Sequence, residues 1–219
     1  MQFDFAVIRP QLRYKLLTST VTPRPIAWVS TLNSDGQQPN AAPFSFFNAF
    51  GEDPPVVAFA ILSRSLDHRK DTENNIRRHG EFVVNLVSED TLDRMNVTSI
   101  DFDPGTSEFD EAGLTPLPSL KIRTPRIAES HVSLECRLMQ IINLGQMRSM
   151  VVGEVLAMHI RDDAVIDADR GHVDTPSLRI VGRGGPNSYV KTTEVVKLSV
   201  PSLDQWRRDR VMTEKPEAL

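Results

Sequence analysis

The sequence is poor in the residues that form covalent cross-links and metal clusters. Its 219 residues include a single cysteine, Cys136, so no internal disulfide can form. One thiolate is also too few for a zinc cluster or an iron–sulfur centre. Cys136 lies in an alternating apolar segment, residues 131–139, that is typical of a strand. This context favours a buried structural thiol over a nucleophile.

Long hydrophobic runs are also missing. No apolar stretch approaches the roughly 20 residues that a membrane-spanning helix needs. The N-terminal segment carries Asp4 early and has no apolar core of signal-peptide length. We therefore expect a cytoplasmic protein without a transmembrane helix.

The sequence has no large excess of charge of either sign. The formal net charge is −4 and the charged residues are interspersed, which gives no electrostatic reason to expect nucleic acid or an anionic membrane as a partner. Its length allows one substantial domain with room for an appended arm.

Several catalytic and metal-binding motifs are absent. No Gly-x-Ser-x-Gly elbow of a serine hydrolase occurs. The glycine-rich residues 182–185 match neither a phosphate-binding P-loop nor a dinucleotide fingerprint. The five histidines show no metal-ligand spacing and are interpreted as surface or hydrogen-bonded residues. They are His68, His79, His131, His159 and His172.

The sequence does contain many short apolar segments separated by Pro, Gly, Asn and Asp, a pattern that indicates strands. We expect strands over residues 26–32, 40–47, 56–62, 81–87, 131–142 and 150–160. The predicted fold class is therefore mainly β, a barrel or sandwich with a few helical decorations.

Three shorter segments have helical patterns. Residues 71–79 begin with Asp71 as a capping residue and an acidic first turn, and they end with a basic last turn before Gly80. Residues 88–95 and 203–211 are the other two candidates. Residues 100–125 are rich in Pro and Asp and lack periodicity, so we expect a long surface excursion there.

A candidate anion site lies at the start of the first of these helices. N–H groups at a helix N-terminus point outward, and the macrodipole adds partial positive charge. Arg69 and Lys70 precede the first turn, and Asp71 and the Thr72 hydroxyl lie on it. Taken alone, the segment is more readily an ordinary surface helix with solvated basic residues.

A second candidate lies in residues 40–47, where small residues precede a proline. Such a strand lets a planar ring approach the backbone closely, and Phe44 or a neighbouring phenylalanine could pack on that ring. Taken alone, a strand with aromatic core residues is the simpler interpretation.

A third candidate is Arg24, which lies between two prolines on a stiff backbone and could hold a phosphate. Ser30 and Thr31 end the following strand with hydroxyls suited to the same anion. A solvated arginine in a turn is the alternative interpretation.

In order and spacing, these segments resemble the flavin reductase-like family, an FMN-binding split-barrel group that includes flavoredoxin. The resemblance covers residues 14–31, Asp35-Gly36, and residues 40–48, 54–57, 69–72, 81–85, 107–114, 135–136, 152–155 and 183–189.

The resemblance implies a six-stranded antiparallel Greek-key split β-barrel that forms a homodimer, with FMN held near the subunit interface. It implies a domain over residues 1–190 and a C-terminal extension over residues 191–219, a candidate dimer arm. The implied phosphate and ribityl contacts are Arg24, Ser30, Thr31, Ser45, Arg69, Lys70, Asp71 and Thr72. The implied ring contacts are Asn40, Ala41, Ala42, Pro43, Phe44 and Ser45.

The implied activity is an oxidoreductase that passes electrons from NAD(P)H through FMN, by hydride transfer at flavin N5, to free flavin or a downstream acceptor. The cofactor supplies this chemistry, so no acid–base dyad is needed. Small reductases of this kind carry a Gly-His-x-Tyr-like element, whereas residues 184–189 contain Tyr189 but no histidine. This departure favours, as alternatives, a flavoredoxin-like electron carrier without its own nicotinamide site, or a non-redox flavin-binding module.

Overall fold

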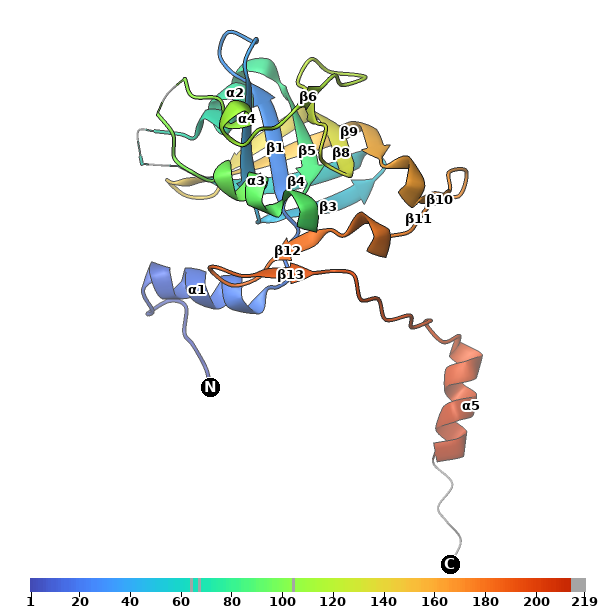
Figure 1. Ribbon diagram of the computed structural model, residues 1–219. Coiled ribbons are helices and arrows are strands. Elements are labelled where there is room, and N and C mark those ends of the chain that lie inside the picture. The colour runs from blue at the N-terminus through green and yellow to red at the C-terminus, as the bar shows by residue number, and fades with distance from the viewer. Residues whose placement is uncertain (64, 67, 104, 214–219) are drawn as a thin grey trace, which may run out of the picture.

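The computed structural model describes residues 1–63, 65–66, 68–103 and 105–213 (Figure 1). In this part of the chain, seven strands form one antiparallel sheet in the order β2-β1-β5-β8-β9-β4-β3. The strands are β1 (Ala27–Leu32), β2 (Pro39–Phe44), β3 (Phe47–Glu52), β4 (Pro55–Leu62), β5 (Glu81–Leu86), β8 (Val132–Asn143) and β9 (Arg148–Ile160).

The sheet closes into a barrel because its two edges are joined by a very short connection. Strands β2 and β3 lie at opposite edges of the sheet, yet only Ser45 and Phe46 separate them in the chain. The Phe46 carbonyl accepts a hydrogen bond of 2.8 Å from the N–H of Ala60 on β4. The expected strand over residues 40–47 corresponds to β2, which ends at this bend, and β3 is a further strand that was not expected, so the main sheet has seven strands where six were expected.

Helices and shorter strands surround the barrel. The helices are α1 (Pro10–Thr20), α2 (Asp71–His79), α3 (Leu92–Val97), α4 (Glu108–Glu111) and α5 (Leu203–Thr213), with 3-10 turns η1 (Glu89–Thr91), η2 (Asp162–Ala164) and η3 (Pro176–Leu178). Three two-stranded sheets pair β6 (Pro116–Leu117) with β7 (Arg126–Ile127), β10 (Val165–Asp167) with β11 (His172–Val173), and β12 (Val181–Arg183) with β13 (Tyr189–Lys191).

Helix α2 has the bounds that the sequence indicated, but not the expected cap. The N-cap is Lys70, which makes no side-chain capping hydrogen bond, and Asp71 is the first helical residue. The carboxylate of Asp71 still lies at the positive end of the helix dipole. The helix ends at Gly80, whose φ of 70° is the left-handed conformation that glycine adopts without steric penalty.

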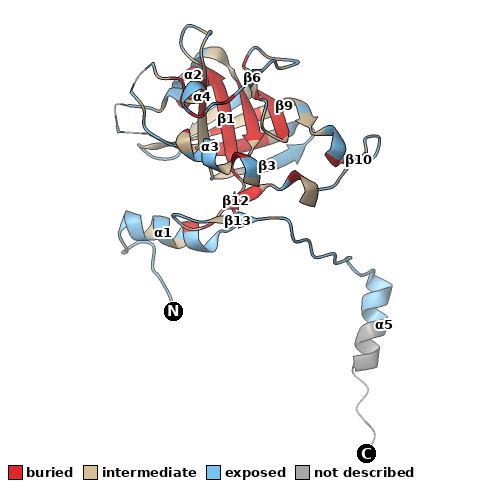
Figure 2. Ribbon diagram, in the orientation of Figure 1, coloured by how far each residue is buried: buried red, intermediate tan, exposed pale blue. Residues whose placement is uncertain are grey.

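Buried residues gather on the barrel strands (Figure 2), and among the described residues the apolar ones form two large clusters and a small third one around Val132, Ala164 and Leu178. Inside the barrel, the Phe59 ring packs between Phe44 and Phe82, with centroids 5.2 and 5.5 Å away. Burying one such side chain contributes about 1.5–3 kcal/mol. Cys136 belongs to this core, and burial raises the pKa of its thiol well above the ordinary range, which agrees with a structural thiol.

The second core corrects the expectation for residues 100–125. This stretch was expected to be a surface excursion, but it carries α4, and the Phe109 side chain is only 1% exposed. Phe109 packs in one cluster with Trp28 of β1 and Met95 of α3. The excursion therefore covers the outer face of β1. Its apolar residues lack a regular spacing, but they pack together with those of β1 and α3 in one cluster.

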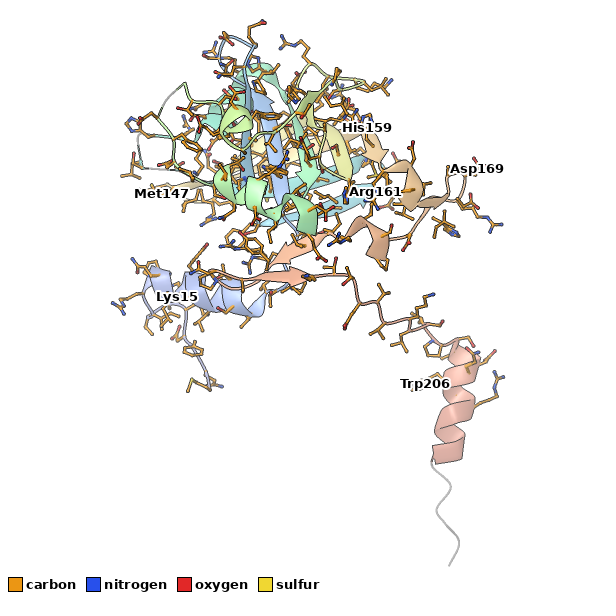
Figure 3. The ribbon with its side chains drawn as sticks, in the orientation of Figure 1. Lys15, Met147, His159, Arg161, Asp169 and Trp206 are labelled. Atoms are coloured by element: carbon orange, nitrogen blue, oxygen red, sulfur yellow. The ribbon has the colours of Figure 1, made fainter. Side chains whose placement is uncertain are left out.

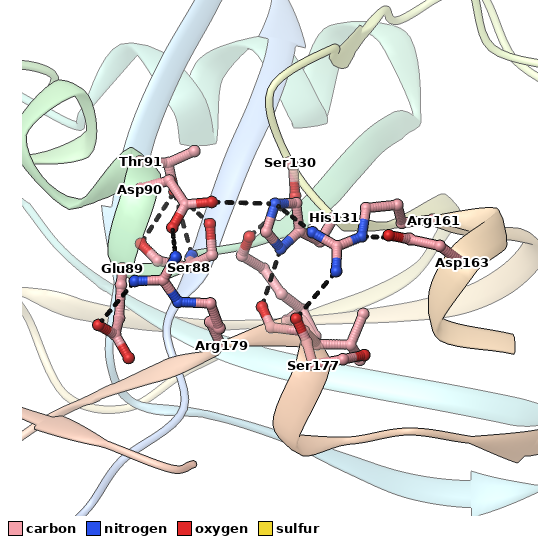
Figure 4. Close-up of polar contacts among 12 residues, drawn as sticks. Ser88, Glu89, Asp90, Thr91, Ser130, His131, Arg161, Asp163, Ser177 and Arg179 are labelled. Atoms are coloured by element: carbon pink, nitrogen blue, oxygen red, sulfur yellow. Dashed lines mark hydrogen bonds and ion pairs between the residues drawn. The ribbon is translucent and has the colours of Figure 1, made fainter.

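A polar network attaches residues 161–179 to the barrel (Figure 4). The His131 ring contacts the Asp90 carboxylate at 3.3 Å and the Leu178 carbonyl at 2.8 Å. Arg161 donates to the Ser177 carbonyl at 3.0 Å. These contacts fix the path of the chain as it enters β12.

Beyond β13, the described chain leaves the barrel. In Figure 1 the segment after β13 runs outward to α5, and Figure 3 shows Trp206 on that helix, away from the labelled His159 and Arg161 of β9 and its end. The described side chains after Thr192 are exposed or half-buried, and Val196, Leu198 and Val200 are each at least 90% exposed.

Candidate functional site

Three hollows adjoin one another at the end of β2, and Pro43 lines all three. The first, the Glu108 hollow, is lined by Glu108 together with Lys70 and Thr72 and has a volume of about 100 Å³. The second, the Arg148 hollow, is lined by Arg148 and again by Lys70 and has a volume of about 180 Å³. The third, the Arg24 hollow, is lined by Arg24 and is the largest of the three, at about 290 Å³.

The Glu108 hollow brings together the two segments that the sequence singled out. Asn40, Ala42, Pro43 and Phe44 of β2 face Lys70, Asp71 and Thr72 at the start of α2. Helix α2 packs against β1 and β2, which places its first turn over the end of β2. Thr98, Ser99, Ile100, Asp101 and Glu108 complete the lining, from the end of α3 and from α4.

Asn40 is the centre of a buried polar network in this hollow. Its Oδ1 accepts hydrogen bonds from the hydroxyls of Thr31, at 3.2 Å, and Thr72, at 3.3 Å. Its Nδ2 donates to Oε2 of Glu108 at 2.7 Å. The Thr31 hydroxyl accepts in turn from Nδ2 of Asn75 at 3.1 Å. Because every partner is fixed, the network holds the backbone of β2 against α2 and α4.

Glu108 is a site residue that the sequence alone did not single out. Burial raises the pKa of its carboxyl, and the hydrogen bonds from its own backbone, from the Ala41 N–H and from Asn40 offset this only in part. The available signal was weak: one acidic residue that opens a four-residue helix within a long irregular stretch.

The Arg148 hollow combines two cations that lie far apart in the sequence. Strand pairing sets Arg148 of β9 opposite Leu62 of β4, and both residues line the hollow together with Lys70. The Arg148 guanidinium lies 5.0 Å from the centre of the Phe46 ring. None of the described residues that line this hollow is acidic, so it favours an anion. No sequence pattern marked Arg148.

Some expected site residues lie elsewhere. Ser30 is fully buried; its hydroxyl donates to the Pro125 carbonyl at 2.7 Å, and it lines none of the three hollows. The side chain of Ala41 belongs to the second core. Arg69 forms an ion pair of 3.4 Å with the buried Glu73, beside the site.

Arg24 lines the hollow next to the one that contains Lys70, and the two hollows share Pro43 and Ser45. Its side chain is buried and donates to the carbonyls of Thr18 at 2.5 Å, Val21 at 2.7 Å and Gly184 at 2.7 Å. Desolvation lowers the pKa of its guanidinium, and the nearby charge of Arg183 lowers it further. The Arg24 and Arg148 guanidinium groups lie 6.0 and 5.0 Å from the centre of the same Phe46 ring, and the expected phosphate contact of Arg24 stays a prediction.

Within the described part of the chain, no cluster of His, Cys, Asp or Glu has a geometry that could hold a metal ion. The described helices are also too short or too polar to cross a membrane. His159 and His79 are hydrogen-bonded, to Glu135 and to the Asn33 carbonyl, as the sequence interpretation expected of them.

Comparison with known proteins places this geometry in a family context. A model of the flavin reductase like domain matches residues 19–175. The structure of 2-nitrobenzoate 2-nitroreductase NbaA from Pseudomonas fluorescens is 38% identical, covers 93% of this chain and 98% of its own, and superposes with a TM-score of 0.84.

Two further structures have the same architecture. Nitrilotriacetate monooxygenase component B from Bacillus cereus is 29% identical, with 90% of this chain and 98% of its own covered and a TM-score of 0.85. A split-barrel-domain protein from Shewanella frigidimarina is 23% identical, with 92% and 100% covered and a TM-score of 0.78. The split-barrel fold and the family resemblance that the sequence indicated are confirmed.

Proposed function

Because the chain belongs to the flavin reductase-like domain family, we propose that it binds FMN non-covalently at the end of β2. The similar proteins of known structure indicate a flavin-related redox role. On this proposal the protein is an oxidoreductase that takes electrons from NAD(P)H and passes them to free flavin or another acceptor. The observation that carries the proposal is the convergence of β2, Lys70 and Arg148 on adjoining hollows.

The charges of these hollows suggest how FMN would be divided between them. A phosphate dianion fits the Arg148 hollow, where Lys70 and Arg148 supply positive charge and no described lining residue is acidic. The Glu108 hollow contains three carboxylates and suits the neutral donors and acceptors of the ring instead. Lys70 lines both hollows and would therefore lie between the two parts of the ligand.

The backbone of β2 is suited to a planar ring. Within the main sheet β2 pairs only with β1, so one edge of its backbone is not used by the ladder. Ser107 and Glu108 cover the start of that edge through hydrogen bonds with the Pro39 carbonyl and the Ala41 N–H, whereas Ala42 and Pro43 line the Glu108 hollow and present little side chain to a ring. Asn40 would fix the strand in place through Thr31, Thr72 and Glu108.

Bound FMN would supply the hydride or electron transfer at its N5, and the residues of this chain would bind and orient it. Lys70 and Arg148 would neutralise the phosphate, and the phenylalanines at the end of β2 would shield the ring from water. The similarity to a nitroreductase and to a monooxygenase component supports an oxidoreductase, in which no side chain of the site needs to act as acid or base.

A second candidate function is an FMN-dependent electron carrier that lacks its own nicotinamide site. Residues 184–189 contain no histidine, whereas small reductases of this kind carry one in the corresponding element. A flavin-binding module without redox activity is the third alternative.

We also propose that the chain forms a homodimer. Leu12, Tyr14 and Leu17 on α1 and Val196 and Leu198 after β13 are exposed. A second copy that covers them would remove this apolar surface from water. The segment after residue 190 would then serve as an arm across the interface.

Anaerobic titration of the purified, FMN-loaded protein separates the oxidoreductase from the carrier. The proposed oxidoreductase loses its absorbance near ~450 nm when NADH or NADPH is added, because reduction removes the oxidised flavin. A carrier is bleached by dithionite and by neither nicotinamide. Protein that neither quenches nor shifts added FMN would contradict both flavin functions.

A further inference from the structure

The Arg24 hollow has an unusual composition for a surface depression. Its described lining includes two arginines, Arg24 and Arg183, and the hydroxyls of Tyr14, Ser45 and Tyr189. None of the described lining residues carries a carboxylate. The hollow shares Pro43 and Ser45 with the Arg148 hollow, so its contents would lie beside the proposed flavin.

Arg24 is a buried cation without a carboxylate partner. Its side chain is 6% exposed, and its three described acceptors are neutral carbonyls. Its Nε is buried and has no hydrogen-bond partner among the described residues. A buried guanidinium that lacks a counter-charge is unfavourable, and an anionic ligand would relieve both deficits.

The backbone sets Arg183 directly beside Arg24. The two residues form an isolated antiparallel bridge, with N–O distances of 2.9 and 2.7 Å. Opposed residues in such a bridge project their side chains to the same side. The Arg183 guanidinium lies 4.6 Å from the centre of the Tyr189 ring and donates to the Tyr189 hydroxyl and the Pro186 carbonyl, which hold it at the wall of the hollow.

We propose that the Arg24 hollow binds the carboxylate of a small aromatic acid, of the size of benzoate, next to the flavin site. Arg24 and Arg183 would hold the carboxylate, while Pro43, Ile26 and Met95 supply an apolar wall for the ring. At about 290 Å³ the hollow lies at the lower end of small-molecule pockets, which favours one ring over a whole dinucleotide.

The inference deepens the proposed function: the position of this ligand beside a flavin rests on that proposal, whereas the binding of the carboxylate does not. The test is calorimetric titration of FMN-loaded protein with benzoate, with neutral benzamide and, as a phosphate source, with ADP. Arg183→Gln is the test variant. Lys191→Gln is the matched control, because it removes a positive charge from the same hairpin but outside the hollow.

We expect benzoate to bind the wild type and Lys191→Gln equally, and to bind Arg183→Gln roughly ten- to hundred-fold more weakly, the effect of one lost charge-assisted contact. Benzamide should bind the wild type at least about tenfold more weakly than benzoate. Equal binding of benzoate and benzamide by the wild type would overturn the inference, even if the variant failed to fold. Binding of ADP but not of benzoate by the wild type would overturn it as well.

FMN affinity is measured in parallel by fluorescence quenching. If the wild type failed to bind FMN, the proposed function would be wrong; benzoate binding, measured on the same protein without FMN, would then decide the inference separately. If FMN bound normally and benzoate did not, only the inference would fail.

Discussion

The hydroxyl of Thr72 donates a hydrogen bond of 3.3 Å to Oδ1 of Asn40, and so ties the first turn of α2 to strand β2. Both side chains are buried, although 31 residues lie between them in the chain. This contact joins the two segments that, taken separately, indicated only an ordinary helix and an ordinary core strand.

Lys70→Ala should weaken FMN binding. Loss of a charge-assisted phosphate contact removes about 1.5–3 kcal/mol, roughly a ten- to hundred-fold change in the dissociation constant. Fluorescence titration with FMN measures it. Lys121→Ala is the control, since Lys121 is exposed and lines none of the three hollows. Unchanged affinity in Lys70→Ala would show that the phosphate lies elsewhere.

Replacing Glu108 by Gln and by Ala should have different effects. Burial raises the pKa of Glu108, so the fold favours its neutral form, and any stability gained from that form is lost as the pH rises through the folded pKa. Gln mimics the neutral carboxyl and keeps an acceptor for Asn40. At neutral pH the free energy of unfolding of Glu108→Gln should therefore be higher than that of the wild type, or equal to it within about 0.5 kcal/mol.

Glu108→Ala, in contrast, leaves the buried Nδ2 of Asn40 unpaired, which should lower the free energy of unfolding by about 1–3 kcal/mol and weaken FMN binding. Urea denaturation of both variants tests the pair. Equal losses in the two would argue against the role assigned to the Asn40 contact.

Acid should weaken the attachment of residues 118–125 to the barrel. Glu135 is fully buried and accepts hydrogen bonds of 2.6 Å from the N–H groups of Leu120 and Lys121 and from His159. Burial alone would raise the pKa of Glu135, but these hydrogen bonds outweigh it and lower the pKa. The carboxylate therefore stabilises the fold above its unfolded pKa of about 4.3, and this contribution is lost as the pH falls through the lower folded value.

Glu135→Gln should cost about 1–3 kcal/mol at neutral pH, because the amide turns a donor toward a backbone N–H. The difference from the wild type should shrink below about pH 4. Thermal unfolding as a function of pH measures it. Glu154→Gln, which breaks only the exposed pair with Arg137, should cost no more than about 1 kcal/mol. A constant difference at every pH would contradict the role of the ionised carboxylate.

Gly182→Ala should separate β12 from the segment that carries Arg24. An added Cβ would lie 2.6 Å from Cβ of Pro23 and 3.3 Å from the Arg24 carbonyl. Such overpacking typically costs about 1–3 kcal/mol. We expect a lower melting temperature for the variant. A melting temperature equal to that of the wild type would mean that β12 moves away from Pro23 without loss of stability.

Deletion of residues 195–219 should leave the barrel and its FMN affinity unchanged. The described side chains from Val195 to Arg208 are exposed, and Thr192 makes the last described contact with the barrel, to the Ile180 carbonyl at 2.6 Å. The deletion should instead shift the oligomeric state toward the monomer, as measured by sedimentation equilibrium. A truncated chain that remains dimeric would locate the interface elsewhere, for example on α1.

Local patterns determined the elements of this fold. Alternating apolar residues set the strands, and the acidic start, basic end and Gly80 set the bounds of α2. These signals depend on neighbours along the chain, and they predicted both segments of the Glu108 hollow, the residues around Asn40 and those around Lys70. Pro43 is typical of an edge strand or a bulge, and β2 is indeed at the sheet edge, but the local signals did not predict the bend at Ser45–Phe46 that follows it.

Only the tertiary structure brought distant residues into one site. Strand register places Arg148 beside Lys70, and an irregular excursion delivers Glu108 to Asn40. The bridge between Arg24 and Arg183 assigns Arg24 to a different hollow from Lys70. Pairing of this kind is decided by which surfaces bury best in the whole barrel, and no short window of sequence contains that information.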